Sequence, residues 1–364
     1  MTPAEFQAAG LYDPAAPKAG ERLELLEWLA GRGLTIDQMQ QADARGQLLF
    51  IAGFVSLRPG PYFTQRELAD RLGVSTEVVE MFRVAFALPP VAPDAPWCNE
   101  AEARMFEAVA GGVGLLGQTA MLRLARVLGS SVSRVAEAMA TGNHERMRGI
   151  LGAGSSELEF AKAGALATDN ADGPARIING LLSIHLEIAS IRLRERRTSF
   201  EAETVHGCVG FVDLVGSTTL SRRLSASQLA AVVDRFEEVA HDIATNGGGR
   251  VVKFIGDEVM FVTGDGASAC DIALSLIEAF AGDPAVTPRA GLAEGALLDR
   301  GGDYYGPVVN LAARLAELAV PSEVLVSMEV ADHLASSGLK CESAGRRLLR
   351  GFDEPVGLMT VRRA

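Results

Sequence analysis

Residues 250–262 read Arg-Val-Val-Lys-Phe-Ile-Gly-Asp-Glu-Val-Met-Phe-Val, so that two runs of β-forming residues flank a Gly-Asp-Glu sequence. A parallel crossover between strands needs about a dozen residues or more, and these runs are much closer together than that. We therefore predict an antiparallel hairpin with Asp257 in its exposed turn. The fold of the surrounding chain can be worked out from this hairpin.

Strand-like and helix-like patterns alternate on both sides of the hairpin. A β-forming run at 208–212 precedes it, and an apolar series with a period of about 3.6 residues lies between the two. After the hairpin we expect a helix at 274–280, a strand at 288–298 and a loop running into a helix at 305–318. Such alternation predicts an α/β or α+β sandwich for the second half of the chain.

The sequence of the first half of the chain predicts a series of helices. Residues 124–139 carry apolar side chains at three- and four-residue spacing, which predicts a stripe facing the core. Residues 64–82 have the outline of a helix-turn-helix and begin with a capping-box pattern at Thr64. Residues 152–173 are small, polar and turn-rich, so we expect a connection there.

An arginine-rich segment separates the two halves. Its arginines are Arg192, Arg194, Arg196 and Arg197. We predict an all-α domain over residues 1–190, a linker helix over 191–205 and a second domain over 206–364.

Length and composition exclude several classes of protein. A chain of 364 residues favours two domains, and a net charge of −12 argues against a general binder of nucleic acid. No apolar stretch approaches the roughly 20 residues that a membrane span needs, and the first ten residues carry no basic leader, so we expect a cytoplasmic protein without a membrane span. The four cysteines lie far apart, which suggests neither disulfides nor a cysteine metal site.

Two carboxylates are candidates for binding a cation. Asp213 closes an apolar run, and the Gly-Ser-Thr turn at 216–218 that follows could offer backbone N–H groups to a phosphate. If the hairpin lies beside this run, Asp257 meets Asp213 at one edge of the sheet. Paired oxygen ligands of this kind suit Mg²⁺ or Mn²⁺ bound jointly with substrate phosphates. Taken alone, Asp213 is also typical of a residue that starts a helix, and Asp257 is typical of an ordinary hairpin turn.

A third candidate is the pair Asn310 and Arg314. The two residues are four apart, so on a helix they present an amide and a permanent cation on the same face. Such a pair could orient a sugar and stabilise charge on a transferring phosphoryl group. A solvated helix face is the alternative for this pair alone.

Taken together, residues 211–218, 253–258 and 302–314 resemble, in order and spacing, the catalytic domain of class III nucleotidyl cyclases. The resemblance covers about residues 206–364 and implies an α+β domain with a ferredoxin-like βαββαβ core. The expected fold is therefore an all-α N-terminal domain followed by this α+β catalytic domain.

The resemblance assigns roles to individual residues. It implies two divalent cations per site, Mg²⁺ or Mn²⁺, held by Asp213, Asp257 and Leu214. With their help the ribose 3′-hydroxyl attacks the α-phosphate and expels pyrophosphate. Lys253 and Asp303 would read the base as a donor to adenine N1 and an acceptor from the 6-amino group. Guanine presents the opposite pattern, so this pair favours ATP over GTP.

The remaining implied roles concern the sugar and the phosphates. Asn310 would position the ribose, Arg314 would stabilise the pentavalent phosphorus, and Arg350 is our candidate for a further contact to the triphosphate. Active sites of this family lie between two catalytic domains, and this chain has one. We therefore expect an obligate homodimer with two equivalent shared sites.

The first half resembles, less specifically, the helical regulatory domain of actinobacterial soluble adenylyl cyclases. This resemblance implies autoinhibitory or modulating control, transmitted through the arginine-rich segment. The signal could be pH, sensed by histidines or arginine-rich joints, or a small hydrophobic ligand such as a lipid.

Other functions fit the sequence less well. A guanylate cyclase is the nearest alternative, and Lys253 with Asp303 argues against it. A diguanylate cyclase would not require Asn310 and Arg314, and no catalytic position is missing as it would be in an inactive receptor-like domain. A helix-turn-helix regulator of transcription is the alternative from another class, but the second helix of that outline carries two glutamates and one arginine, which suits contact with DNA phosphates poorly.

Overall fold

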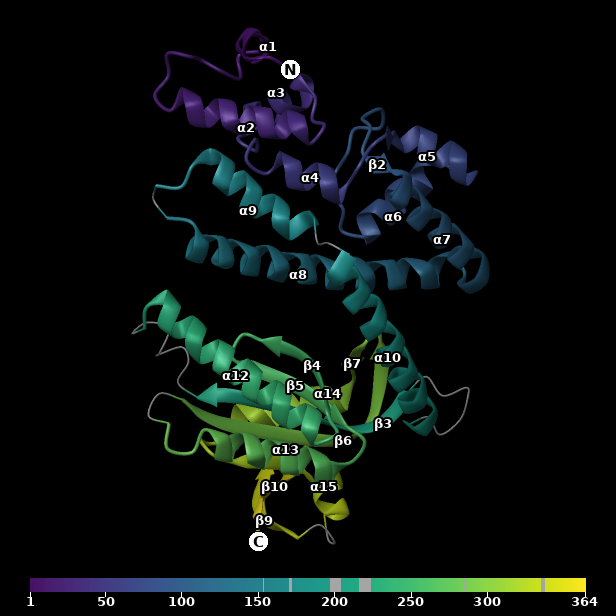
Figure 1. Cartoon of the computed structure of the whole chain (residues 1–364). Coiled ribbons are helices and arrows are strands. Elements are labelled where there is room, and N and C mark those ends of the chain that lie inside the picture. Colours follow the sequence, from purple (N-terminus) through teal and green to yellow (C-terminus); the bar gives the residue numbers. More distant parts are fainter. Residues whose placement is uncertain (153, 170–171, 197–203, 216–223, 284–285, 335–337) are drawn as a thin grey trace. The chain divides into compact units, whose positions relative to one another are not determined.

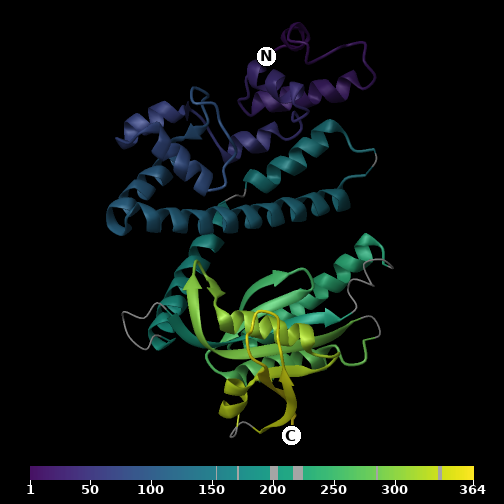
Figure 2. The ribbon, with the colours of Figure 1, turned by 180° about the vertical axis from the view of Figure 1, so that it is seen from behind.

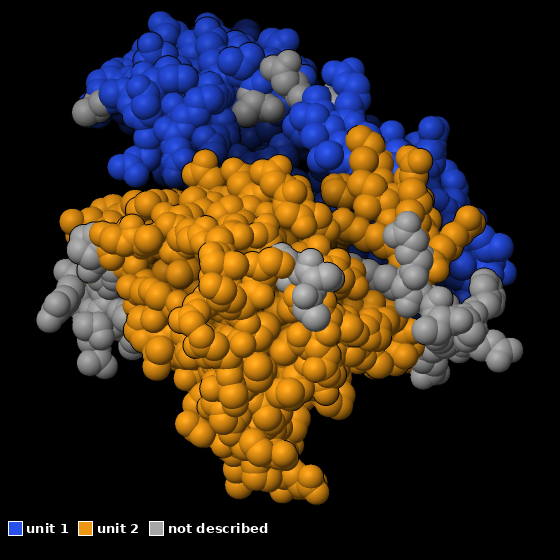
Figure 3. Space-filling view, turned by 90° about the horizontal axis from the view of Figure 1, so that it is seen from below, with its two compact units in different colours: residues 1–183 blue, residues 184–364 orange. Residues whose placement is uncertain are grey.

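The computed structural model describes residues 1–152, 154–169, 172–196, 204–215, 224–283, 286–334 and 338–364. The chain divides into two compact units, Met1–Ser183 and Ile184–Ala364, which Figure 3 shows in blue and orange. The division falls within the long helix α10 (Asp172–Arg196). Within the described ranges, no helix has both the length and the apolar character needed to cross a bilayer.

The first unit is built of helices, which Figure 1 draws in purple to teal. They are α1 (Pro3–Ala8), α2 (Ala19–Gly31), α3 (Ile36–Ala44), α4 (Ile51–Leu57), α5 (Gln65–Leu72), α6 (Thr76–Ala85), α7 (Glu100–Leu116), α8 (Gln118–Ile150), α9 (Glu157–Asp169) and the first half of α10. A two-stranded ladder joins β1 (Tyr62–Phe63) to β2 (Cys98–Asn99). One core gathers around α2 and α9, and a second around α5 to α8.

The helix-turn-helix outline is confirmed as local structure. Thr64 and Glu67 form the predicted capping box of α5, and Gly73 ends that helix in the left-handed conformation. The arginine of α6, Arg83, is only 5% exposed and donates to the Glu80 carboxylate at 2.5 and 2.7 Å. Its guanidinium is therefore committed to the interior of this unit, where it cannot reach a DNA phosphate.

Two predictions for the first half are wrong. The apolar stripe over 124–139 does not face the core: Leu124, Leu128 and Val132 are 42%, 37% and 52% exposed. Helix α8 packs through its small residues instead, because Ala125 and Gly129 allow its backbone to approach α6 closely. The expected connection at 152–173 contains α9, in which Ala161 and Ala165 are buried against α2 and α4.

The second unit is a mixed sheet in the order β4-β5-β3-β6-β8-β10-β9, with β7 paired to the end of β6. Its strands are β3 (Thr204–Val215), β4 (Arg250–Ile255), β5 (Glu258–Thr263), β6 (Thr287–Arg300), β7 (Asp303–Tyr305), β8 (Val324–Ser327), β9 (Leu339–Arg347) and β10 (Val356–Arg363). The predicted hairpin is confirmed as β4 and β5, which pair antiparallel. Strand β3 lies between β5 and β6 and is antiparallel to both.

Helices cover both faces of this sheet, as Figures 1 and 2 show from opposite sides. They are α12 (Ala226–Asn246), α13 (Gly266–Ala279), α14 (Pro307–Leu318) and α15 (Met328–His333). Side chains alternate along β3, so that Cys208 and Val212 pack with α12, α13 and α15 while Val209 and Phe211 pack with α14. This layered arrangement confirms the expected α+β class. The four cysteines are free thiols, and three of them are buried.

Candidate active site

Asp213 and Lys253 lie on the face of the sheet that α14 covers. Along β3, Asp213 follows Val209 and Phe211 at the two-residue period, which places it on this face. Lys253 of β4 is paired in register with Met260, which also packs beneath α14. Strand alternation, together with the register shift in β4 between Val251 and Lys253, therefore brings these residue types to one surface.

The two candidate metal ligands lie at one end of the sheet. Asp213 is paired in register with Glu258, the residue directly after Asp257. The turn is held beside β3 because the Leu214 N–H donates to the Asp257 carbonyl oxygen at 3.3 Å. The antiparallel pairing of β3 and β5 thus brings together two aspartates that are 44 positions apart in the numbering.

Negative charge accumulates at this end of the sheet. Burial raises the pKa of Glu258, and the neighbouring Asp213 and Asp257 carboxylates add a smaller contribution, which together bring it to about 7. Among the described residues, no group of three or more His, Cys, Asp or Glu side chains could by itself enclose a metal ion. Mg²⁺ is usually held by one or two carboxylates together with water and substrate phosphates. A pair of aspartates in an electronegative environment fits that mode of binding.

Arg289 is a residue of the site that the sequence reasoning missed. It is paired with Asp213 in the β3–β6 ladder, and its guanidinium donates to Asp213 Oδ2 at 2.7 and 3.0 Å. Nothing near Arg289 in the sequence points to Asp213, because the two are 76 positions apart. Only the strand register brings them together.

The two candidate base-reading residues form an ion pair. Lys253 Nζ lies 2.5 Å from Asp303 Oδ2, and the other oxygen of Asp303 accepts from the Tyr304 N–H at 2.8 Å. The turn before β7 is also anchored to β4, because the Arg250 guanidinium donates to the Gly302 carbonyl at 3.0 Å. The β6–β7 hairpin therefore presents Asp303 to β4 in a defined position.

Helix α14 carries Asn310 and Arg314. It begins at Pro307, whose fixed φ suits the first turn of a helix. It lies directly on β6 at Gly291, where a Cβ atom would be 2.0 Å from the Ala316 nitrogen. Asn310 is exposed, while the Arg314 guanidinium is held 2.6 Å from the Glu317 carboxylate one turn along. The helix thus presents an amide and an arginine beside the sheet.

Arg350 is exposed in the turn between β9 and β10, and within the described residues no hydrogen bond or ion pair joins it to Asp213 or Asp257. The predicted phosphate-binding turn at 216–218 and the arginine Arg197 lie outside the described residues.

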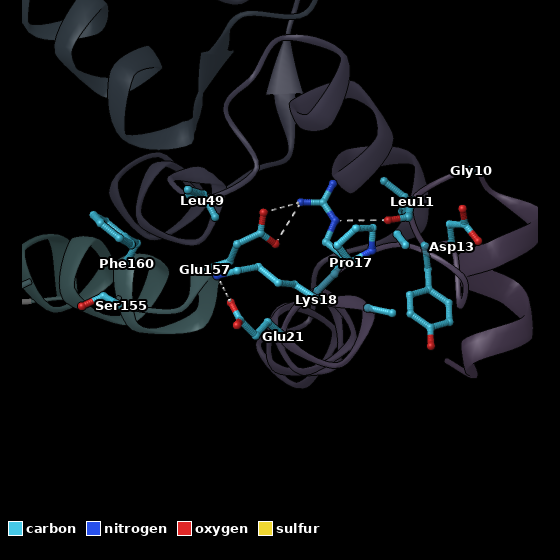
Figure 4. A pocket seen from close by; sticks show the side chains of 14 residues that line it. Gly10, Leu11, Asp13, Pro17, Lys18, Glu21, Leu49, Ser155, Glu157 and Phe160 are labelled. Atoms are coloured by element: carbon cyan, nitrogen blue, oxygen red, sulfur yellow. Dashed lines mark hydrogen bonds and ion pairs between the residues drawn. The ribbon is translucent and has the colours of Figure 1, made fainter. Parts of the chain in front are cut away.

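A pocket of about 700 Å³ opens in the first unit, between the N-terminal loop, α2 and the start of α9. Figure 4 shows Leu11, Leu49 and Phe160 around it with the charged Glu157. Arg22, which also lines it, donates to the Leu11 carbonyl at 3.2 Å and to Glu157 at 3.3 Å. The pocket combines apolar walls with a paired charge, and it is separate from the sheet residues described above.

Comparisons with known proteins match both halves of the chain. Residues 5–189 match the family described as "Adenylate cyclase regulatory domain", and residues 201–360 match the "Adenylate and Guanylate cyclase catalytic domain".

Several relatives match along most of the chain. A pH-sensitive adenylate cyclase of Mycobacterium tuberculosis is 32% identical over 97% of this chain and 91% of its own length. An adenylate cyclase of Streptomyces coelicolor is 31% identical over 75% of this chain and 71% of its own. Among solved structures, the adenylyl cyclase CyaB from P. aeruginosa is 26% identical, with a TM-score of 0.41, and is matched over 45% of this chain and 97% of its own.

Proposed function

Because this chain belongs to the class III adenylate cyclases that carry an adenylate cyclase regulatory domain before the catalytic domain, we propose that it converts ATP to 3′,5′-cyclic AMP and pyrophosphate on the α14 face of its sheet. The observation that supports this most directly is the 2.5 Å contact between Lys253 and Asp303, because it places a cationic donor and an anionic acceptor side by side.

Lys253 and Asp303 read the adenine. The Lys253 ammonium donates to ring N1, and the Asp303 carboxylate accepts from the 6-amino group. Guanine carries a donor at N1 and an acceptor at position 6, so both contacts would become repulsive or unpaired with GTP. The ion pair holds the two side chains next to each other, so that a donor and an acceptor are offered to the base together.

Asp213 and Asp257, with the backbone of Leu214, would hold two divalent cations, Mg²⁺ or Mn²⁺. These ions supply Lewis-acid activation of the ribose 3′-hydroxyl and neutralise the triphosphate. Asn310 orients the ribose, and Arg314 stabilises the charge on the pentavalent phosphorus. The bond from the 3′-oxygen to the α-phosphorus forms as the bond from the α-phosphorus to the oxygen of the β-phosphate breaks; pyrophosphate leaves, and the hydroxyl proton passes to solvent. Arg350 is a candidate contact for the triphosphate.

We infer that the working form is a homodimer with two shared sites. Asp213 and Asp257 of one chain act with Lys253, Asp303, Asn310 and Arg314 of the other. Two-fold symmetry then generates two equivalent sites from one kind of interface.

We further propose that residues 1–190 modulate the catalytic domain, residues 206–364, through the segment 191–205 that connects them. Of the helix expected over 191–205, α10 covers the part up to Arg196, where it stops, and Thr204 already belongs to β3. The signal is either pH or a small hydrophobic ligand. The pocket beside Leu11, Leu49 and Phe160 is one place where an apolar molecule could bind.

The test is the formation of cyclic nucleotide by the purified full-length protein. ATP and GTP are compared side by side with Mg²⁺ or Mn²⁺, at pH values of about 5.5 and 7.5, on either side of the ordinary histidine pKa. We expect cyclic AMP from ATP and little product from GTP. Cyclic GMP as the main product would favour the guanylate cyclase alternative. No product from either nucleotide, with the second half tested alone as well, would contradict the proposal.

A further inference from the structure

A shift in strand register decides where the first side chain of β4 points. Arg250 is paired in register with Val262 of β5. Lys253 is paired with Met260, because β4 carries one extra residue, as in a β-bulge, between Val251 and Lys253. In a regular strand, side chains three positions apart point to opposite faces. The extra residue brings Arg250 and Lys253 to the same face, since their two partners on β5 both pack beneath α14.

From this face, Arg250 contacts the residues on both sides of Asp303. Its Nη2 donates to the Gly302 carbonyl oxygen at 3.0 Å, and its guanidinium carbon lies 5.2 Å from the centre of the Tyr304 ring. A guanidinium at this distance from an aromatic ring is attracted to it. Tyr304 is only 6% exposed, so the ring is itself held by the packing around it. One side chain of β4 therefore holds the β6–β7 hairpin immediately before and immediately after Asp303.

The hairpin has few other restraints at this point. Gly301 and Gly302, which form its turn, both have positive φ, and glycine keeps the most conformational freedom of any residue. Strand β7 is three residues long and pairs with the end of β6. A ladder this short opens easily, so a side-chain contact to β4 adds stability that the backbone hydrogen bonds lack. The position of Asp303 therefore depends on Arg250.

We propose that Arg250 is a positioning residue for recognition of the adenine 6-amino group. By holding the hairpin on both sides of Asp303, it keeps the carboxylate of that residue beside Lys253 Nζ, 2.5 Å away. The acceptor and the donor are then presented to the base together, in a fixed arrangement. The inference rests on the proposed function, in which Asp303 accepts from the 6-amino group. Arg250 acts through Asp303 and does not itself contact the nucleotide.

Two substrates isolate this role. One is ATP, and the other is purine riboside 5′-triphosphate, in which a hydrogen replaces the 6-amino group of ATP. The ratio of kcat/KM for ATP to kcat/KM for the analogue measures the contact of Asp303 with the amino group. We expect a ratio of about ten or more in the wild type, because a site built for a hydrogen bond discriminates against a substrate that lacks it. A change that only weakens the fold lowers both kcat/KM values and leaves their ratio unaltered.

The experiment compares full-length proteins that carry Arg250→Ala, Asp303→Ala or both changes. Arg250→Ala should lower the ratio about fivefold, because the acceptor is no longer held in place. Asp303→Ala should bring the ratio to about one, and adding Arg250→Ala to it should change the ratio no further. Arg250→Lys should recover part of the ratio, since its ammonium can still donate to the Gly302 carbonyl.

Arg235→Ala is the matched control. Arg235 makes the same two kinds of contact elsewhere in the second unit: it donates to the Asp283 carboxylate at 2.8 Å, and its guanidinium carbon lies 5.0 Å from the centre of the Phe280 ring. Neither of these partners is a candidate site residue. The ratio in Arg235→Ala should therefore equal that of the wild type.

The outcomes separate the inference from the function it rests on. A wild-type ratio that stays unchanged in an active Arg250→Ala variant would overturn the inference alone. So would a further fall in the ratio when Arg250→Ala is added to Asp303→Ala, because Arg250 would then act by another route. A wild-type enzyme that forms cyclic AMP with a ratio of about one would contradict the reading of the base by Asp303. A wild-type enzyme that forms no cyclic AMP would contradict the proposed function, and the inference fails in both of these cases.

Hydrogen exchange gives a measurement without catalysis. In full-length Arg250→Ala, the backbone amides of residues 301–305 should exchange about fivefold faster than in the wild type and in Arg235→Ala. The amides of β3 and β5 should exchange at the wild-type rate, which shows that the variant is folded. Unchanged exchange at 301–305 in a folded variant would overturn the role of Arg250 in holding the hairpin.

Discussion

Lys253 and Asp303 come from strands at different places in the sheet, and their ion pair places a hydrogen-bond donor beside an acceptor. Both side chains are partly exposed, at 37% and 24%, so a ligand can reach them while their charges remain paired. The identity of these two residues, more than the shape of the fold, should decide between ATP and GTP.

We expect the double variant Lys253→Glu, Asp303→Asn to lose about tenfold or more in its ratio of kcat/KM for ATP over GTP. Lys253→Glu replaces a hydrogen-bond donor with an acceptor, and Asp303→Asn supplies a donor where there was none. Initial rates with the two nucleotides measure the ratio. Lys340→Glu, at an exposed position of β9, is the matched control. An unchanged ratio in an active double variant would show that other residues read the base.

Asp257→Ala should abolish cyclic AMP formation, with a loss of about a hundredfold or more, and leave the protein folded. The Leu214 N–H bonds to the backbone carbonyl of Asp257, so that contact survives the substitution. The loss of one carboxylate also relieves repulsion on Glu258, whose pKa it helps to raise. The checks are activity and the melting temperature, with the exposed Asp242→Ala as control. Normal turnover would refute the metal-binding role.

At the scale of elements, a buried carboxylate joins β6 to α15. The Glu294 side chain is 5% exposed, and its oxygens lie 3.2 Å from His333 Nδ1 and 3.8 Å from His206 Nδ1. The hydrogen bond with Glu294 raises the pKa of His333 above its ordinary 6.5. A histidine with a raised pKa stabilises the folded state at low pH, and this contribution disappears as the pH rises through the raised value.

We therefore expect His333→Asn to lower the melting temperature by about 2 °C more at a pH of about 6 than at a pH of about 8. His241→Asn is the matched control, because His241 faces only Asp242 of its own helix at 3.8 Å. Thermal unfolding of the full chain at both pH values measures the difference. Equal losses at the two pH values would mean that the ion pair contributes nothing to stability.

Helix α8 can lie close to Phe86 because Gly129 has no side chain. A Cβ atom there would lie 2.5 Å from the Phe86 backbone, whereas one at Gly142 of the same helix would meet nothing within 4 Å. Gly129→Ala should destabilise the protein by about 1–3 kcal/mol through overpacking. Gly142→Ala should stabilise it by about 0.5–1 kcal/mol, since alanine loses less conformational entropy in a helix. Denaturant unfolding compares the two variants, and equal effects would contradict the close approach.

At the scale of the whole molecule, the two units each have their own buried cores, and α10 is the covalent connection between them. If the first unit modulates the second, a fragment of residues 184–364 should form cyclic AMP at a rate that differs from the full chain by about fivefold or more, the usual scale of coupling between sites. Rates of both proteins at acidic and neutral pH test this. Identical rates throughout would leave the first unit without a regulatory role.

Local pattern determined much of this protein from the sequence alone. The hairpin around Asp257, the capping box at Thr64 and the alternation of strands and helices depend on residues close together in the chain, and each was predicted. The candidate site residues could also be identified from the sequence, because they lie in short local motifs. Their roles stay predictions until they are tested.

The tertiary structure alone decided which surfaces are buried and which distant residues meet. Periodicity over 124–139 identifies an apolar face but not its partner, and the small residues Ala125 and Gly129 beside that face make the closer contact. The Arg289–Asp213 and Glu294–His333 pairs depend on the register of β6 and on the packing of α15 against it. Strand register and helix packing depend on the burial of many side chains across the whole unit. They therefore cannot be predicted from any short stretch of sequence.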